Sequence, residues 1–128
     1  MTDKRVISTD KAPAAIGAYN QAVVADGVVY CSGQIALDPM TGELIEGDVQ
    51  TQTRQVMNNL AAVLEAAGTN FARALKCTVF LTDLGDFQAV NEVYATYFDA
   101  EDAPARACVE VSRLPRDVQV EVDCVALI

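Results

Sequence analysis

The sequence predicts an α+β fold in which two helices pack on one face of a single six-stranded sheet, mostly antiparallel or mixed. Three observations support this prediction: a hairpin signal near the N-terminus, two segments with helical periodicity, and β-rich runs before, between and after them. The resulting order is strand, hairpin, helix, strand, helix, strand, strand. A length of 128 residues matches the usual domain size of roughly 100–150 residues, and no linker divides the chain, so we expect one domain over residues 1–128.

The strongest local signal is a β-hairpin in the first quarter of the chain. Residues 21–25 and 28–32 are rich in apolar and β-branched side chains. Asp26 and Gly27 lie between them, and this dipeptide is typical of a two-residue hairpin turn. A short strand over residues 5–8 is predicted to precede the hairpin.

The first helix is predicted to begin after Asp48. From this point the apolar residues recur with a period near 3.6, which indicates an amphipathic helix. Asp48 can cap its N-terminus and Gly68 can end it. The apolar stripe comprises Val49, Val56, Met57, Leu60, Val63, Leu64 and Ala67.

The second half of the chain predicts three strands and one helix. Residues 75–81 form an apolar, β-branched strand, after which Asp86 can cap a second helix that ends before Pro104. Residues 105–111 and 118–127 alternate as strands. The second helix carries Phe87, Val90, Tyr94, Tyr97 and Phe98 at helical spacing.

One face of this sheet is predicted to lack a cover within the chain. In the strand at residues 28–32, Val28 and Tyr30 occupy one face while Val29 and Cys31 occupy the other, so both faces are apolar. Two helices cover only one face, and we therefore expect the other face to pack on another subunit. A closed symmetric ring is the usual form of such an assembly.

Charge and hydropathy exclude several classes of partner. The net charge is −9, and the nine basic residues are scattered without a cluster, so nucleic acid is not an expected partner. The first residues lack the apolar core of a signal peptide, and no apolar run approaches the ~20 residues of a membrane span. We expect a cytoplasmic protein without a membrane partner.

The residue types present also limit the chemistry. The chain contains no histidine, which removes Ser-His-Asp and Cys-His nucleophile systems and the commonest zinc ligand. The four cysteines lie far apart in sequence, without the short spacing of zinc or dithiol sites. We expect them to be reduced core residues, and Cys108 is the one to examine for a functional role. Proton transfer then depends on carboxylates, Tyr, Lys or Cys.

The last two strands contain the residues that best predict a functional site. If the apolar side chains of these strands face the helices, alternation places Arg106, Cys108 and Glu121 on the uncovered face. Buried charges are costly unless they are paired or used. Arg106 can receive a carboxylate through its planar guanidinium, and a shielded Glu121 can carry a proton. The alternative is that Arg106 and Glu121 form a structural ion pair across an interface or lie at a solvated rim.

Two further segments present polar groups near this region. Tyr19 precedes the hairpin and has a phenol that can close over a substrate, or that simply packs. Ser32 and Gly33 end a strand where backbone N–H groups can approach a ligand. Asn91 lies within the stripe of the second helix, where a surface or satisfied amide is the simpler interpretation.

The chain closely resembles the RidA (YjgF) family of reactive enamine and imine deaminases, nearly end to end. The run from Arg106 to Glu121 is the family's signature and is highly specific. Ala18 and Ala36 replace prolines that are common in the family, and we expect these alanines to loosen the nearby loops. The resemblance rests on Gly17-Ala18-Tyr19, Ser32-Gly33-Gln34, the run from Asp83 to Asn91, the run from Pro104 to Val111, and Val120-Glu121.

The resemblance implies a homotrimer of chorismate-mutase-like subunits, with the sheets forming an inner barrel and the active sites lying in clefts between neighbours. Arg106 would bind the substrate carboxylate, and Glu121 would position and activate water. The implied substrates are 2-aminoacrylate and related 2-imino acids released by pyridoxal-phosphate enzymes, hydrolysed to 2-keto acids and ammonia without metal or cofactor. The cleft would be lined by Tyr19, Ser32, Gly33, Asn91 and Cys108.

Three other functions remain open from the sequence. A non-catalytic trimer could bind small ligands through Arg106, with a regulatory or chaperone-like role. A chorismate-mutase-like rearrangement would need further cations, for which Arg113 and Arg116 on a nearby loop are candidates. An endoribonuclease is a third alternative, which the net charge of −9 disfavours.

Overall fold

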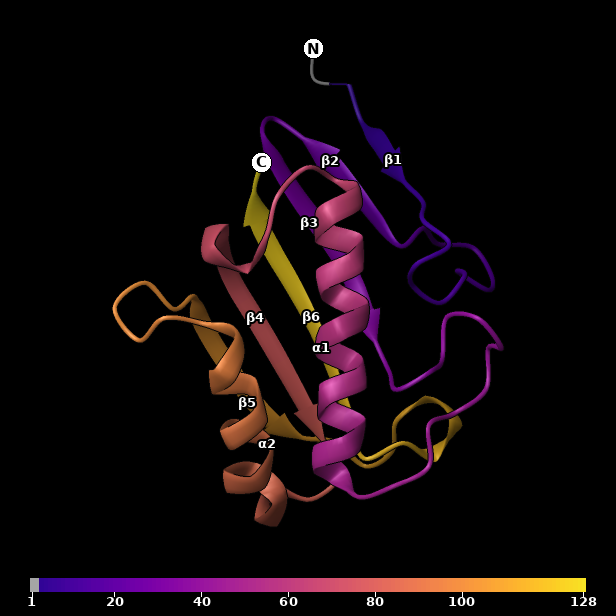
Figure 1. Cartoon of the computed structure of the whole chain (residues 1–128), viewed down its shortest axis with the longest axis vertical. Helices are drawn as coiled ribbons and strands as arrows, with labels where there is room; N and C mark the ends of the chain where they lie inside the picture. The colour runs from indigo at the N-terminus through magenta and orange to yellow at the C-terminus, as the bar shows by residue number, and fades with distance from the viewer. Residues whose placement is uncertain (1–2) are drawn as a thin grey trace.

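The computed structural model describes residues 3–128 and confirms the predicted α+β architecture. One six-stranded mixed sheet has the order β1-β2-β3-β6-β4-β5, and its neighbouring strands are antiparallel except for β4 and β5. Both helices, α1 (Val49–Ala66) and α2 (Phe87–Tyr94), lie on the same side of this sheet (Figure 1). The strands are β1 (Arg5–Ile7), β2 (Ala22–Ala25), β3 (Val28–Gln34), β4 (Ala74–Leu81), β5 (Ala105–Glu110) and β6 (Val120–Leu127).

The predicted hairpin joins β2 to β3. Asp26 and Gly27 both have positive φ, 51° and 76°, which is the backbone geometry of a tight two-residue hairpin turn. Ala25 therefore pairs directly with Val28, and the register carries through to Ala22 opposite Cys31.

The limits of α1 follow the predicted caps. The Asp48 side chain accepts a hydrogen bond from the backbone N–H of Thr51 at 2.8 Å, which satisfies one of the free donors of the first turn. Gly68 follows the last turn with a φ of 88°, a conformation that costs glycine little. The predicted apolar stripe is buried along its whole length.

The predicted cap of α2 is wrong. A short 3₁₀ turn, Leu84–Asp86, runs directly into the helix, so the backbone of Asp86 is already helical and its side chain makes no capping hydrogen bond. Asp83 caps this turn instead, accepting from the N–H of Gly85 at 2.8 Å. After Tyr94 a second 3₁₀ turn, Ala95–Tyr97, continues the segment.

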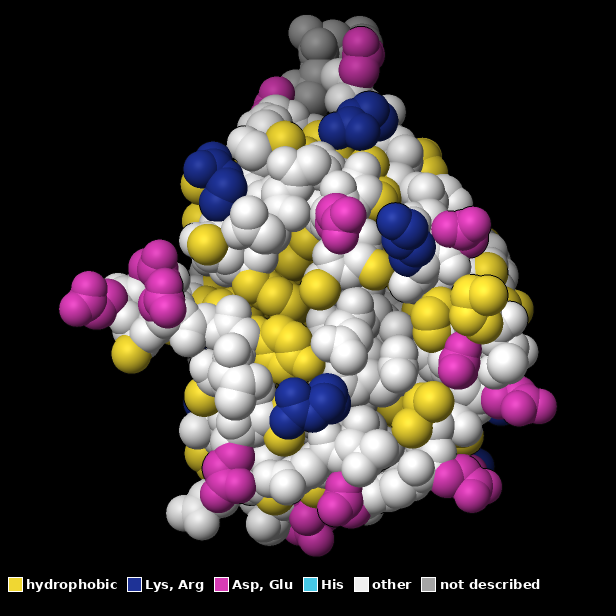
Figure 2. All heavy atoms as spheres, in the orientation of Figure 1, with side chains coloured by type: hydrophobic (Ala, Val, Ile, Leu, Met, Phe, Trp, Pro, Cys, Tyr) yellow, Lys and Arg dark blue, Asp and Glu magenta, His cyan; other side chains and the backbone are white. Residues whose placement is uncertain are grey.

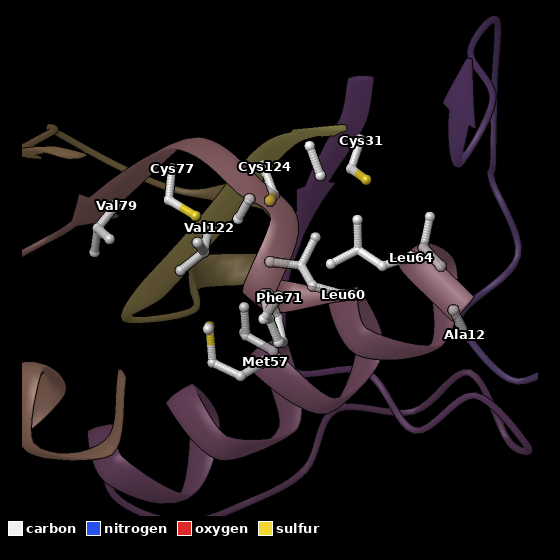
Figure 3. Close-up of a cluster of buried hydrophobic side chains, with 14 of the residues drawn as sticks. Ala12, Cys31, Met57, Leu60, Leu64, Phe71, Cys77, Val79, Val122 and Cys124 are labelled. Carbon is white, nitrogen blue, oxygen red and sulfur yellow. The ribbon is translucent and has the colours of Figure 1, made fainter. Parts of the chain in front are cut away.

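The core lies between the sheet and the two helices. Cys31, Cys77 and Cys124 point from three neighbouring strands into the side chains of α1, such as Met57 and Leu60 (Figure 3). All three thiols are buried and reduced, as predicted, and burial raises the pKa of Cys31 to about 12. These cysteines therefore act as small apolar core residues.

The opposite side of the sheet, called here the open face, is not covered by a helix. Its apolar side chains include Val6, Tyr30, Val109 and Leu127, which are between 38% and 50% exposed. Glu121 and Asp123 of β6 project from the same face, because their neighbours Val120, Val122 and Cys124 point into the core.

Candidate active site

Glu121 lies in a pocket at the edge of the open face. The pocket has a volume of about 440 Å³ and combines Glu121 with Tyr19, Ser32 and Gly33, which the sequence also singled out. Four parts of the chain meet there: β6, the loop before β6, the end of β3 with the residues that follow it, and the loop before β2. The remaining lining residues are two amides, Gln21 and Gln34, and the apolar Pro13, Ala14, Ile16, Ile35, Leu37 and Pro115.

Gly33 is required by the position of Glu121. A Cβ atom at residue 33 would overlap the Glu121 carboxylate, with Oε2 the nearest atom. The pairing of β3 with β6 is irregular between Cys31 and Gln34, and this irregularity brings the glycine close to the carboxylate. The absence of a side chain at Gly33 therefore makes room for Glu121.

Gly33→Ala is expected to displace the Glu121 carboxylate and to lower the kcat/KM of the reaction proposed below about a hundredfold, because a displacement near 1 Å can have that effect. Steady-state kinetics of the purified variant would measure this loss. Gly68→Asn, at a glycine outside the pocket with open space around it and a φ that Asn tolerates, serves as the control and should stay close to the parent. Parental kinetics in Gly33→Ala would contradict the proposed role of Glu121.

The polar groups beside Glu121 are held by the backbone. The Ser32 hydroxyl donates to the carbonyl of Asn20 at 2.6 Å, and the Tyr19 hydroxyl accepts from the N–H of Ile16 at 3.3 Å. The Tyr19 side chain remains 51% exposed. Both side chains thus form the rim of the pocket and stabilise the loop that precedes β2.

Burial raises the pKa of the Glu121 carboxyl, and the negative charge of Asp123 raises it further. Asp123 lies two residues along the same strand and accepts a hydrogen bond from the N–H of Thr78 at 3.0 Å. A carboxyl group with a raised pKa can both accept and return a proton nearer to neutral pH.

Arg106 does not lie on the open face, so this prediction is wrong. Its Cα pairs with that of Cys77 on the parallel neighbour β4, and the side chain of Cys77 points into the core under the helices. Cys108 likewise pairs with buried Val79. Arg106 and Cys108 therefore lie on the helix side of the sheet, whereas Glu121 lies on the other.

Arg106 points to the helix side because side chains of α2 bind its guanidinium. Asn91 accepts a hydrogen bond from Arg106 Nη1 at 2.7 Å, and Arg106 Cζ lies 5.3 Å and 4.9 Å from the ring centroids of Phe87 and Tyr94. These aromatic faces stabilise a cation that an aliphatic surface would exclude. Val109 on the edge strand β5 instead remains 42% exposed on the open face.

A second pocket of about 390 Å³ lies beside Arg106, and its lining includes Asn91, Tyr94, Phe98 and Pro104. Phe87, Asn91 and Tyr94 are spaced i, i+4 and i+7 on one face of α2. Sequence reasoning assigned the two aromatic residues only to the core and missed their role around Arg106, although this spacing was a usable signal.

Cys108 is half-buried next to Arg106. Burial raises the pKa of its thiol, and the positive charge of Arg106 opposes this shift. The thiol is thus mainly protonated at neutral pH, which does not favour a role as a nucleophile.

Arg113 and Arg116 do not add positive charge to either pocket. Arg113 forms an ion pair with Asp117 on the exposed loop before β6. Arg116 donates to the carbonyl of Gly42 at 3.3 Å, and neither arginine lines the pocket of Glu121 or that of Arg106.

Within residues 3–128 no group of three or more His, Cys, Asp or Glu side chains is arranged to hold a metal ion. In the same part of the chain, no helix combines the length and hydropathy needed to cross a membrane.

Comparison with known proteins identifies the family. The family described as Endoribonuclease L-PSP matches residues 9–128. A RutC family protein of Synechocystis is 54% identical over 97% of this chain and 96% of its own. The 2-iminobutanoate/2-iminopropanoate deaminase of Rattus norvegicus is 48% identical over 97% of this chain and 90% of its own. The solved structure of E. coli TdcF with bound serine is similar with a TM-score of 0.90 at 45% identity, covering 97% of this chain and 98% of its own.

The chain is therefore a member of the RidA (YjgF) family, as its motifs indicated.

Proposed function

We propose that the protein hydrolyses 2-imino acids and their enamine tautomers, such as 2-iminopropanoate and 2-aminoacrylate, to 2-keto acids and ammonia. The observation that carries this proposal is the carboxyl group of Glu121, which has a raised pKa and lies against Gly33 in a pocket large enough for a small substrate. The deaminase name of the rat relative supports the same activity.

The proposed chemistry needs only a positioned water and a proton carrier. The ionised Glu121 takes a proton from water as the oxygen attacks the electrophilic imine carbon, forming a tetrahedral carbinolamine. The carboxyl then returns the proton to the nitrogen. The imine reacts in its protonated form, so this returned proton makes the nitrogen an ammonium group. As the C–N bond breaks, ammonia leaves, the hydroxyl oxygen forms the C=O bond, and its proton passes to the regenerated Glu121 carboxylate, which releases it to solvent. No metal, cofactor or covalent nucleophile takes part.

We further propose that each site combines two subunits of a homotrimer. Glu121 and Arg106 lie on opposite faces of one sheet, so one chain cannot direct both at the same small molecule. The apolar open face offers a surface for a neighbour. Arg106 and Asn91 of one subunit would then meet Glu121, Tyr19, Ser32 and Gly33 of the next, with Cys108 close to the guanidinium.

Each alternative is less well supported by the site. A rearrangement of a dianionic substrate calls for several cations, and Arg113 and Arg116 are engaged elsewhere. An RNA substrate calls for a basic surface, whereas the net charge is −9 and the Lys and Arg side chains on the helix side are scattered singly (Figure 2). A binding or regulatory trimer would use Arg106 but would not need the proton carrier Glu121.

A coupled assay tests the activity directly. An amino-acid oxidase generates the imine in situ, and semicarbazide traps whatever imine remains. We expect added protein to decrease the semicarbazone in proportion to its concentration. An unchanged semicarbazone yield would contradict the proposed function.

The same assay tests the pH dependence. Because Glu121 must be ionised to accept a proton from water, kcat/KM should fall as the pH decreases through its raised pKa. Asp123→Asn removes one cause of the raised pKa but keeps an oxygen acceptor for Thr78, so it should move this acidic limb to lower pH. An acidic limb at the parental pH in Asp123→Asn would contradict the assignment to Glu121.

A further inference from the structure

We infer that two buried side-chain amides, Gln21 and Asn59, are positioning residues that hold the two loops forming the walls of the Glu121 pocket. One wall comes from the loop before β2, which contributes Pro13, Ala14, Ile16, Tyr19 and Gln21 itself, and the other from residues 35–37 after β3. The inference rests on the proposed function for its kinetic consequences, but its structural content is independent of the reaction.

Gln21 binds the first wall through both polar atoms of its amide. Its Nε2 donates to the carbonyl oxygens of Pro13 at 2.7 Å, Thr9 at 3.0 Å and Ala12 at 3.3 Å, and its Oε1 accepts from the N–H of Thr9 at 2.7 Å. The side chain is only 4% exposed. Residues 9–13 belong to neither a strand nor a helix, so these contacts replace the regular hydrogen bonds that the segment lacks.

The main chain of Gln21 extends the connection to the polar rim. Its carbonyl oxygen accepts from the N–H of Ser32 at 2.9 Å, next to Gly33 and the Glu121 carboxylate. Gln21 thereby links the loop before β2 to the part of β3 against which Glu121 packs. A change in its amide contacts should reach Tyr19 and Ile16, which lie on the same loop.

Asn59 holds the second wall from α1. Its Nδ2 donates to the carbonyl oxygens of Ile35 at 3.2 Å and Leu37 at 3.0 Å, and its Oδ1 accepts from Gln55 at 2.8 Å. The side chain is 1% exposed, in a helix whose other buried residues are nearly all apolar. Ile35 and Leu37 both line the pocket, so Asn59 fixes the distance of this apolar wall from the core.

A purely structural role is the competing explanation, since any buried amide with satisfied partners stabilises the fold. The two roles differ in their consequences below the melting temperature. A structural residue changes only the stability, whereas a positioning residue also changes the local order of the loops and the binding of substrate. Thr53 provides a matched control: it is fully buried in α1, but its hydroxyl donates only to Val49 within the helix, at 2.7 Å.

The experiment compares Gln21→Met and Asn59→Leu, which keep the side-chain volume but remove the amide, with Thr53→Val. Hydrogen exchange by mass spectrometry is measured well below the melting temperature of each variant. We expect faster exchange over residues 9–19 in Gln21→Met and over residues 35–37 in Asn59→Leu, and unchanged exchange over both segments in Thr53→Val. Gln21→Glu, which keeps the acceptor for Thr9 but loses the donors, gives a second test if Gln21→Met does not fold.

Kinetics provide the second measurement. In the imine assay we expect KM to rise about tenfold in Gln21→Met and Asn59→Leu with a smaller change in kcat, because the walls bind substrate while Glu121 itself is retained. Loops that exchange at the parental rate would overturn the inference, as would a parental KM combined with a lowered melting temperature. An inactive parent would count against the proposed function alone, because the exchange data still decide whether the amides order the walls.

Discussion

Glu121→Gln is expected to lower kcat by about 10²–10⁴-fold, the usual contribution of a positioned general base. The amide has nearly the shape of the carboxylate, so the pocket against Gly33 should keep its form while water loses its proton acceptor. KM should change little, because we propose that the carboxylate of the substrate is bound by Arg106 and not by Glu121. The semicarbazone assay measures the loss, and Glu65→Gln on the exposed side of α1 is the control.

The melting temperature of Glu121→Gln shows whether a loss of activity comes from the missing proton acceptor or from unfolding. Burial raises the pKa of Glu121, so the folded state favours the neutral acid, and its stability decreases as the pH rises through that pKa. Gln is neutral at every pH, and Glu121→Gln should therefore melt at or above the parental temperature near neutral pH, with the difference vanishing in acid. A variant that clears imine at the parental rate would favour the ligand-binding alternative.

Arg106→Ala is expected to lower kcat/KM by about 10²–10³-fold, which corresponds to about 3–4 kcal/mol for two charge-assisted hydrogen bonds to a carboxylate. Lys should recover only part of the loss, because an ammonium lacks the planar pair of donors and the stacking on Phe87 and Tyr94. Steady-state kinetics measure both variants, with Arg54→Ala on α1 as the control. A parental kcat/KM in Arg106→Ala would show that substrate binds elsewhere.

Mixing two inactive variants tests whether the site is shared. If Arg106 acts across an interface, hybrids of Glu121→Gln and Arg106→Ala subunits contain sites in which both residues are intact. Random assembly of equal amounts gives each site about one chance in four of this arrangement, so activity should recover to about a quarter of the parental value. Native mass spectrometry confirms that hybrids have formed. Hybrids without activity would contradict the two-subunit site.

Elements defined by neighbours in the sequence were predicted well. Asp26 and Gly27 specify their hairpin because a two-residue turn with positive φ depends on those two residues alone. Asp48 and Gly68 limit α1 for the same local reason. Asp86 failed as a cap because the 3₁₀ turn before it, capped by Asp83, makes its backbone helical.

The sequence predicted the sheet face correctly for Glu121 but wrongly for Arg106. Glu121 was placed correctly because β6 lies in the middle of the sheet, where Val120, Val122 and Cys124 can only be the core side. Arg106 was placed on the wrong face because β5 is an edge strand. The side chains on its helix side pack against aromatic residues of α2, which accept a cation. An apolar pattern reports that a side chain is suited to burial, but not what buries it.

The sequence by itself determined the fold class, the hairpin, the limits of α1 and the family, because local periodicity, turn residues and motifs are properties of the chain. It also predicted Arg106 and Glu121 as site residues. Only the tertiary structure decided that Arg106 and Glu121 lie on opposite faces of one sheet. It also showed that the amides of Gln21 and Asn59 donate hydrogen bonds to backbone carbonyls of residues that line the Glu121 pocket. The physical reason is that strand pairing and helix docking join residues far apart in sequence, and these contacts decide which side chains meet.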